Sequence, residues 1–175
     1  LDDHETIAKQ IADMRPNCDV LIVSAHMGTE GTHEVNDFQR ETAQWLADQG
    51  VNAIEVSGGN TSSLPRKGPI RAIRRTKEPM YFKAYAAEAA ALLKGKTDVG
   101  VVGGFRTIAD IEEALESTDL AFISMSRPFL RQPDLPNRWK SGDTEPALCI
   151  SCSRCFGAEN VDCIFNKKEK EKQDA

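Results

Sequence analysis

Four cysteines lie close together near the C-terminal end of this 175-residue sequence, and a fifth, Cys18, stands alone before an apolar run and is interpreted as a small core residue. Thiolates at such short spacing are good ligands for soft metals and for iron–sulfur clusters. Nothing in the sequence indicates secretion, so ligation is favoured over a disulfide framework. The sequence therefore predicts a metal site, with an iron–sulfur cluster, zinc and free thiols left open as alternatives, at Cys149, Cys152, Cys155 and Cys163.

A second group of residues follows two consecutive predicted strands. Gly103 and Gly104 come directly after one apolar run, and Ser126 and Arg127 end the next one. In parallel α/β folds ligands bind at the carboxyl ends of strands. There, glycines let backbone N–H groups approach phosphate oxygens, a guanidinium forks onto the same oxygens, and a following helix N-terminus adds positive potential. These residues predict a phosphate site, and the alternative is a pair of turn glycines beside a surface ion pair.

Two loops carry further polar groups. One contains His26, Glu30, His33 and Glu34, which could supply ligands to zinc or to a dinuclear site, the alternative being an ordinary polar loop. The other, 64–78, holds six Lys or Arg and one Glu, so its charge is 6 − 1 = +5. It could attract an anionic substrate or the phosphates of a nicotinamide cofactor, the alternative being a solvated loop.

The elements that must position these residues alternate between helix and strand. Apolar residues at helical spacing predict helices at about 7–14, 36–50 with its caps, 81–94 and 107–116. Apolar runs predict buried strands at 20–23, 51–56, 99–102 and 120–125. Asn36 is an expected N-cap, Gly50 an expected C-terminal stop, and Thr107 with Asp110 an expected capping-box variant. Tyr81 is assigned to the core face of the third helix.

Four αβ units with parallel strands predict an α/β fold that is half of a TIM (β/α)8 barrel, with a small open sheet as the alternative. Half a barrel leaves two strand edges unpaired, so it needs a complementary half-barrel, self-association or rearrangement. The predicted half-barrel domain covers 1–146. From Pro128 onward we expect turns and irregular structure, and 147–175 forms an irregular cysteine-rich segment with a charged, frayed tail at 167–174.

Composition narrows the possible partners. The net charge is −5 and the pI is near 5.3, which argues against a nucleic-acid binder. No apolar run is long enough for a membrane span and no signal-peptide pattern is present, so we expect a cytoplasmic protein with no membrane partner. The sequence begins with Leu1 rather than Met, so a fragment or processed piece is expected.

Several motifs together resemble a known family. The stretches AIEVSGG, VGVVGGFRT, FISMSRPFLRQPDLPNRWKSGD and CISCSRCF, within residues 52–166, resemble the C-terminal half of the Old Yellow Enzyme family of NADH:flavin oxidoreductases. Within it they look like bacterial enzymes related to 2,4-dienoyl-CoA reductase. The resemblance implies a TIM-barrel flavoprotein that holds FMN and takes hydride from NAD(P)H. It also implies FMN phosphate contacts at Gly103, Gly104, Ser126 and Arg127.

The same resemblance bears on the cysteines and on catalysis. In the dienoyl-CoA reductase branch four cysteines at this place hold a [4Fe–4S] cluster, although the third and fourth spacings are longer there than here. The first half of the family's barrel supplies most flavin-ring contacts and the substrate-orienting acid. That half has no counterpart in this sequence, so the catalytic residues remain unknown.

The N-terminal segment has a different resemblance. DVLIVSAHMGTEGTHEVNDFQRETAQWLADQG, residues 19–50, resembles the CapA-type poly-γ-glutamate capsule biosynthesis proteins, which have a metallophosphatase-like fold. The match includes the motif from His26 to Glu30 and implies His26 as a metal ligand. The family's partner ligands are not matched, and Ser57-Gly58-Gly59 stands where the downstream motif is expected. The chain therefore looks like a hybrid joined near 51–53, with 1–51 of different origin.

Three functions are carried forward. The first is an FMN-dependent oxidoreductase of the ene-reductase type acting on a small-molecule substrate, or the phosphate-binding half of one. The second is a non-catalytic half-barrel that binds a phosphate ligand or a partner. The third, ranked last because its ligands are incomplete, is a metal-dependent capsule-biosynthesis hydrolase.

Overall fold

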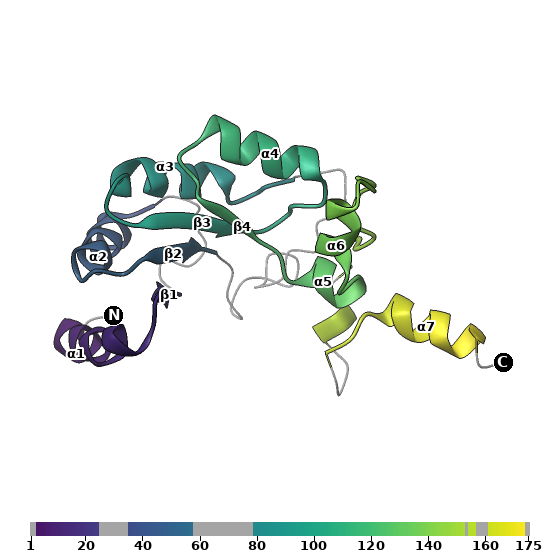
Figure 1. The fold of residues 1–175 in the computed structure, drawn as a ribbon, viewed down its shortest axis with the longest axis horizontal. Coiled ribbons are helices and arrows are strands. Elements are labelled where there is room, and N and C mark those ends of the chain that lie inside the picture. The colour runs from purple at the N-terminus through teal and green to yellow at the C-terminus, as the bar shows by residue number, and fades with distance from the viewer. Residues whose placement is uncertain (1–2, 25–34, 58–78, 153, 157–160, 174–175) are drawn as a thin grey trace. The chain divides into compact units, whose positions relative to one another are not determined.

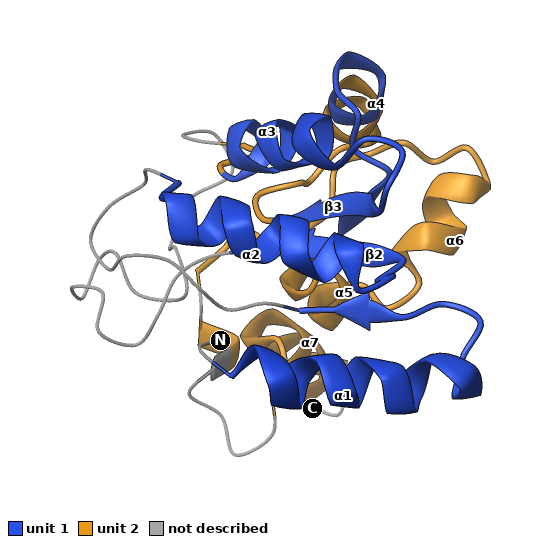
Figure 2. Cartoon of the chain, turned by 90° about the vertical axis from the view of Figure 1, so that its left-hand side faces the viewer, with its two compact units in different colours: residues 1–58, 82–102, 114–124 blue, residues 59–81, 103–113, 125–175 orange. Residues whose placement is uncertain are grey.

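The computed structural model describes residues 3–24, 35–57, 79–152, 154–156 and 161–173. The candidate metal loop with His26, Glu30, His33 and Glu34, Gly58 and Gly59, and the basic loop 64–78 lie outside the described residues. The chain divides into two compact units (Figure 2). Unit 1 comprises 1–58, 82–102 and 114–124, and unit 2 comprises 59–81, 103–113 and 125–175. The domain boundary expected at residue 146 stays a prediction.

Unit 1 contains a four-stranded parallel sheet in the order β1-β2-β3-β4 (Figure 1). Its strands are β1 (Ile22–Val23), β2 (Ala53–Val56), β3 (Asp98–Val102) and β4 (Phe122–Ser124). In a (β/α)8 barrel, strands that are consecutive in sequence are also neighbours in space. In a doubly wound sheet, by contrast, the order of the strands reverses at a switch point. The predicted α/β fold with four αβ units is confirmed, and its strand order is that of half a barrel.

Four helices precede the strands or lie between them: α1 (His4–Met14), α2 (Asp37–Asp48), α3 (Lys83–Leu93) and α4 (Ile108–Ser117). A 3-10 turn, η1 (Arg15–Asn17), follows α1. Asn36 accepts the N–H of Gln39 at 2.9 Å and donates its own N–H to the Gln39 side chain at 3.0 Å, forming a capping box. The Thr107 hydroxyl accepts the N–H of Asp110 at 3.0 Å, and Gly50 follows α2 with φ +80°. The four predicted helices and these caps are therefore confirmed, except that α3 begins at Lys83 rather than at Tyr81.

The two faces of the sheet differ in burial. Side chains of paired residues in a parallel sheet share a face, so the pairing Ile54↔Val99 and Val56↔Val101 places these residues together. Ile54, Val99 and Val101 are buried on that face. On the opposite face Phe122 is half-buried, and its ring lies across Gly100. The face of Ile54 therefore carries the larger buried side chains of the sheet, while Ala53 is buried on the opposite face.

The first strand is not buried throughout, which corrects the sequence interpretation of 20–23. Val20 and Ile22 are 60% and 58% exposed, while Leu21 between them is 5% exposed. Among the described strands β1 pairs only with β2. An edge strand with one covered face alternates between buried and exposed side chains, and this alternation was hidden because both sets are apolar.

Unit 2 is more helical than the sequence predicts. It contains α5 (Arg127–Arg131), α6 (Leu135–Lys140), a 3-10 turn η2 (Arg154–Phe156) and α7 (Ile164–Gln173), together with 108–113 of α4. The turns expected from Pro128 and the frayed tail at 167–174 are therefore corrected over these ranges, whereas 143–152 is irregular as predicted.

The charged tail forms the helix α7, which contacts α5 through the side chains of Arg131 and Asn166. Nδ2 of Asn166 donates to the carbonyls of Leu130 and Arg131 at 3.1 and 3.2 Å. Arg131 makes two hydrogen bonds to the Glu169 carboxylate, at 2.6 and 2.8 Å, and a third to Asn166. Its guanidinium also lies 5.8 Å from the centre of the Phe165 ring. These partners stand 34 to 38 positions further along the chain, so local charge alternation gave no sign of them.

Within the part of the chain that the structure describes, every helix is too short or too polar to cross a membrane.

Candidate functional site

The turn after β3 requires glycine at two successive positions. Gly103 has φ +132° and Gly104 has φ +85°, backbone conformations that residues with a Cβ rarely adopt. A Cβ on Gly104 would also lie 2.7 Å from the backbone nitrogen of Met80 and 2.9 Å from the Tyr81 ring. Conformation and space both exclude a side chain at Gly104, so the backbone there stays bare.

Tyr81 connects this turn with Arg127. Its ring lies against Gly104, and its hydroxyl accepts a long hydrogen bond, 3.4 Å, from Nη2 of Arg127. The preceding residue, Met80, has φ +52°, a strained conformation for a residue with a side chain. Strain of this kind persists only where the surroundings enforce it.

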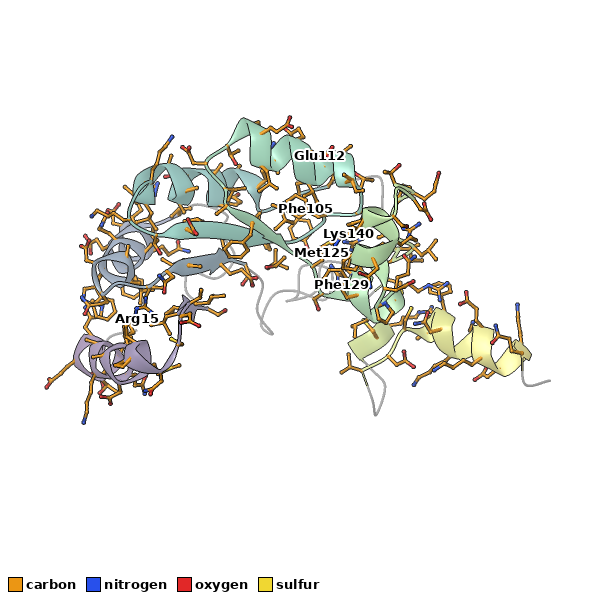
Figure 3. All side chains as sticks on the ribbon, viewed as in Figure 1. Arg15, Phe105, Glu112, Met125, Phe129 and Lys140 are labelled. Carbon is orange, nitrogen blue, oxygen red and sulfur yellow. The ribbon has the colours of Figure 1, made fainter. Side chains whose placement is uncertain are left out.

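Ser126 and Arg127 begin the short helix α5. The Ser126 carbonyl accepts the N–H groups of Phe129 at 3.0 Å and Leu130 at 3.2 Å, and its side chain is exposed. Arg127 is half-buried. Figure 3 shows the side chains of this unit, with Phe129 labelled on α5. The structure thus brings Arg127 and Gly104 together through Tyr81, with Gly103 next in the chain and Ser126 at the start of the helix.

A buried arginine lies two residues after the glycines. Arg106 is 7% exposed. Its Nε donates to the carbonyl of Cys149 at 3.1 Å, Nη1 to the carbonyl of Phe105, and Nη2 to the hydroxyl of Ser151. In return, the Arg106 carbonyl accepts the N–H of Ala147 at 2.8 Å. One side chain and its own backbone therefore hold the start of the cysteine-rich segment against the glycine turn.

The same segment is also attached to α5. The N–H of Leu148 donates to the side-chain oxygen of Gln132 at 2.6 Å, and Gln132 is the C-cap of α5. The Gln132 N–H itself donates to the carbonyl of Pro128 at 2.8 Å. Ala147–Ser151 consequently contacts both the turn that carries the glycines and the helix that carries Arg127.

The cysteines are free thiols that differ in burial. Cys155 is buried, Cys152 is exposed, and Cys149 and Cys163 are half-buried. Burial raises the pKa of the Cys155 thiol, partly opposed by the positive charge of Arg127. Among the described residues, no three His, Cys, Asp or Glu side chains are arranged to hold a metal ion. The side chains as they stand do not form a closed metal site, and ligation by the four cysteines stays a prediction.

Sequence reasoning missed Tyr81, Arg106 and Gln132. Tyr81 was assigned to the core face of a helix, but α3 begins at Lys83, and Tyr81 lies before it. Arg106 stands inside the quoted motif VGVVGGFRT without any signal of burial. Arg127 lies 46 positions from Tyr81, and Cys149 and Ser151 lie 43 and 45 positions from Arg106, so no local pattern could identify these partners.

Comparison with known proteins finds two kinds of match. Residues 2–59 match the family described as "Bacterial capsule synthesis protein PGA_cap". Over 140 residues, 73% of the chain, it is 32% identical to an NADH-dependent flavin oxidoreductase of Talaromyces variabilis. Over 134 residues, again 73% of the chain, it is 26% identical to a bilirubin reductase of Clostridium symbiosum. The chain spans about a third of these two relatives, 33% and 35% of their lengths.

Among solved structures, a mandelate oxidase variant with (S)-mandelic acid matches with a TM-score of 0.41 and 18% identity. The match covers 67% of this chain and 29% of that one. Both resemblances found in the sequence, to capsule-synthesis proteins and to flavin oxidoreductases, thus have a counterpart among known proteins.

Proposed function

We propose that this chain is the FMN phosphate-binding part of a flavin-dependent oxidoreductase. The observation that carries the proposal is the contact of Tyr81 with both Gly104 and Arg127, which joins a bare glycine turn to a guanidinium. The similarity to an NADH-dependent flavin oxidoreductase supports a flavin as the phosphate-bearing molecule. A cytoplasmic location remains a prediction from the sequence.

The donors of this site suit a phosphate group. Backbone N–H groups at a glycine turn approach phosphate oxygens closely because no side chain intervenes. The Arg127 guanidinium adds charge-assisted hydrogen bonds in a planar fork, and Tyr81 limits the rotation of that fork. Ser126 contributes an exposed hydroxyl at the beginning of α5. FMN, when bound, would supply hydride transfer between NAD(P)H and an acceptor such as an activated alkene.

The described residues supply only the phosphate end of the proposed flavin site. The described strands form one four-stranded sheet in which β1 and β4 each have one neighbour. Eight parallel strands close a barrel of this type, so a complementary half-barrel or a second copy of this chain would pair with both edges. We therefore propose that flavin-ring contacts and the catalytic acid are contributed across such an association.

A non-catalytic phosphate-binding half-barrel is the second candidate. It is favoured by the edge strand β1, which has one neighbour among the described strands and whose Ile22, with the preceding Val20, is exposed. Both candidates use the same phosphate site. They differ in whether NADH can reduce the bound flavin. Adding NADH to the FMN-bound chain and following the flavin spectrum therefore separates them.

The test is a titration of the purified chain with FMN, followed by flavin fluorescence. We expect Arg127→Ala to weaken binding about 10- to 100-fold, because hydrogen bonds to a charged group contribute about 1.5–3 kcal/mol. Arg154→Ala is the matched control, since Arg154 is an exposed arginine of the same unit. Failure of the folded chain to bind FMN, or equal binding by Arg127→Ala, would overturn the proposal.

Iron, sulfide and zinc content, with the visible spectrum of the protein before FMN is added, tests the cysteines separately. A cluster or zinc at Cys149, Cys152, Cys155 and Cys163 requires these thiols to come together, and stoichiometric metal lost in Cys152→Ser would establish it. A metal-free, folded chain that binds FMN would leave the cysteines as free thiols.

A further inference from the structure

We infer that Arg106 and Gln132 are positioning residues for the phosphate site. Through them the segment Ala147–Ser151, here called the brace, connects the turn at Gly103 and Gly104 with the helix α5 that carries Arg127. The inference rests on the proposed function, because it concerns the anion affinity of that site. It adds a structural role for the start of the cysteine-rich segment that needs no metal.

The first attachment of the brace is to the glycine turn. Arg106 follows Gly104 by two residues and uses its guanidinium and its carbonyl to bind the brace at three points: the Cys149 carbonyl, the Ser151 hydroxyl and the Ala147 N–H. Because a guanidinium is planar and its donors are fixed in direction, these bonds set both the distance and the orientation of the turn. A lysine at this position has a single nitrogen and cannot satisfy both acceptors in the same plane.

The second attachment of the brace is to α5. The side-chain oxygen of Gln132 accepts the N–H of Leu148, which directly follows Ala147 in the brace. Gln132 lies five positions after Arg127 and caps the same short helix through the Pro128 carbonyl. A helix of five residues is only marginally stable by itself. Contact at its C-terminal end therefore limits how far Arg127 can move at its N-terminal end.

The brace itself is strained where Arg106 holds it. Ser151 is buried and has φ +57°, a strained conformation for a residue other than glycine. Its hydroxyl accepts from Nη2 of Arg106. A strained residue held by a buried charged group indicates that the chain path of the brace is specified.

The geometry of the brace and the binding of an anion at the phosphate site should influence each other. If the brace sets the geometry of the phosphate site, then an anion bound there stabilises the brace by the same free energy. Cys149 reports on this coupling because its thiol lies on the brace and its carbonyl bonds to Arg106. We expect FMN to slow the reaction of Cys149 with a maleimide in the wild-type chain and to have no such effect when Arg106 is replaced.

The experiment compares Arg106→Lys, Gln132→Leu and Gln132→Glu with the wild-type chain, all in the full-length protein. We expect FMN affinity to fall about tenfold or more in the first two and to be largely restored in Gln132→Glu, which keeps a side-chain acceptor for Leu148. Arg138→Lys is the matched control. Arg138 also binds backbone, at the carbonyls of Glu145 and Pro146 with 2.7 and 3.4 Å, two residues that precede the brace.

Hydrogen exchange of the amides in 103–107 and 126–132 gives a second measurement that does not need FMN. Faster exchange in both segments for Arg106→Lys and Gln132→Leu, but not for Arg138→Lys, supports the brace. Equal exchange in all four proteins overturns it. If the wild-type chain does not bind FMN, the proposed function fails and exchange alone decides the inference. If the wild-type chain binds and both variants bind equally well, the inference fails and the proposed function stands.

Discussion

The interactions inside unit 1 differ in kind from those inside unit 2. In unit 1 the fully buried side chains, apart from Thr42, are apolar and come from successive helices and strands, as Leu46 of α2, Leu93 of α3 and Val101 of β3 illustrate. Its ion pairs are exposed, such as Lys96 with Asp48 at 3.0 Å. In unit 2 the segments are joined by Arg106, Arg131 and other polar side chains that bind backbone or carboxylate groups.

Apolar burial in unit 1 and polar contacts in unit 2 differ in how precisely they fix atomic positions. Burial of apolar surface has no preferred direction, so it stabilises a sheet without fixing atoms to a fraction of an ångström. Hydrogen bonds to a guanidinium are directional, so they fix the positions of the turn and the helix that form the proposed phosphate site. Unit 1 should therefore respond to changes in side-chain volume, and unit 2 to changes in hydrogen-bonding geometry and charge.

The largest effect is expected from Leu46→Ala. Leu46 is fully buried in unit 1, and removing a buried leucine side chain costs about 2–5 kcal/mol of unfolding free energy, including the cavity that it leaves. Urea unfolding of the two proteins measures the difference, which we expect to be the same at low and high salt. Leu92→Ala is the control, because Leu92 is 49% exposed, and it should cost well under about 1 kcal/mol. Equal costs for the two variants would show that α2 does not pack in the core described here.

Gly100→Ala should have the next largest effect. A methyl group on Gly100 would lie 2.2 Å from the Phe122 ring, so the ring must leave its place across β3. Overpacking of this kind costs about 1–3 kcal/mol. The double variant Gly100→Ala with Phe122→Leu should recover part of the loss, since the smaller side chain makes room. Additive costs in that cycle would argue that Phe122 does not occupy this position.

These contrasts explain which parts of the fold follow from the sequence. The helices and strands of unit 1 are local patterns with regular spacing, and Asn36 and Gly50 mark their ends within a few residues, so they were predicted. Burial of β1 was not, because an edge strand with apolar residues on both faces has the same sequence as a central one. The helix α7 was missed because Arg131, which binds it, lies 38 positions before Glu169.

Some residues of the candidate site could likewise be predicted from the sequence, and others could not. Gly103, Gly104 and Arg127 could be proposed from residue type and position after strands. The role of Tyr81 could not, since Met80 adopts a positive φ that its residue type disfavours, and Tyr81 reaches Arg127 across 46 positions. Arg106 was missed for a related reason: burial of an arginine is exceptional and depends entirely on acceptors supplied by a distant segment.

A smaller effect, comparable in the two units, is expected from the helix caps. Asn36→Ala removes a reciprocal capping box in unit 1, and Thr107→Ala removes a single bond to Asp110 in unit 2. Each should cost about 0.5–2 kcal/mol, because each change removes the side-chain acceptor of one backbone N–H, that of Gln39 or that of Asp110. Thr107→Ser should restore stability. If Thr107→Ala alone also weakens FMN binding, the cap contributes to the position of the neighbouring Arg106.

The smallest effect concerns pH and is confined to unit 2. The Arg131 guanidinium, through its hydrogen bonds, holds the pKa of the Glu169 carboxyl below its ordinary value of 4.5, and the same contact raises the pKa of Arg131. Because the carboxyl is more acidic in the folded state, the stabilisation is present above pH 4.5 and is lost as the pH falls through the lowered pKa.

Glu169 is exposed, so solvent screens the pair, and high salt should weaken it in the same direction as acid. Amide exchange in 164–173 measures the docking of α7. We expect it to quicken at low pH in the wild-type chain and to be fast at every pH in Glu169→Gln, while Glu171→Gln behaves as the wild type. Slow exchange of α7 in Glu169→Gln would mean that Asn166 and Phe165 hold the helix without the ion pair. Unit 2 would then depend on packing more than the comparison with unit 1 implies.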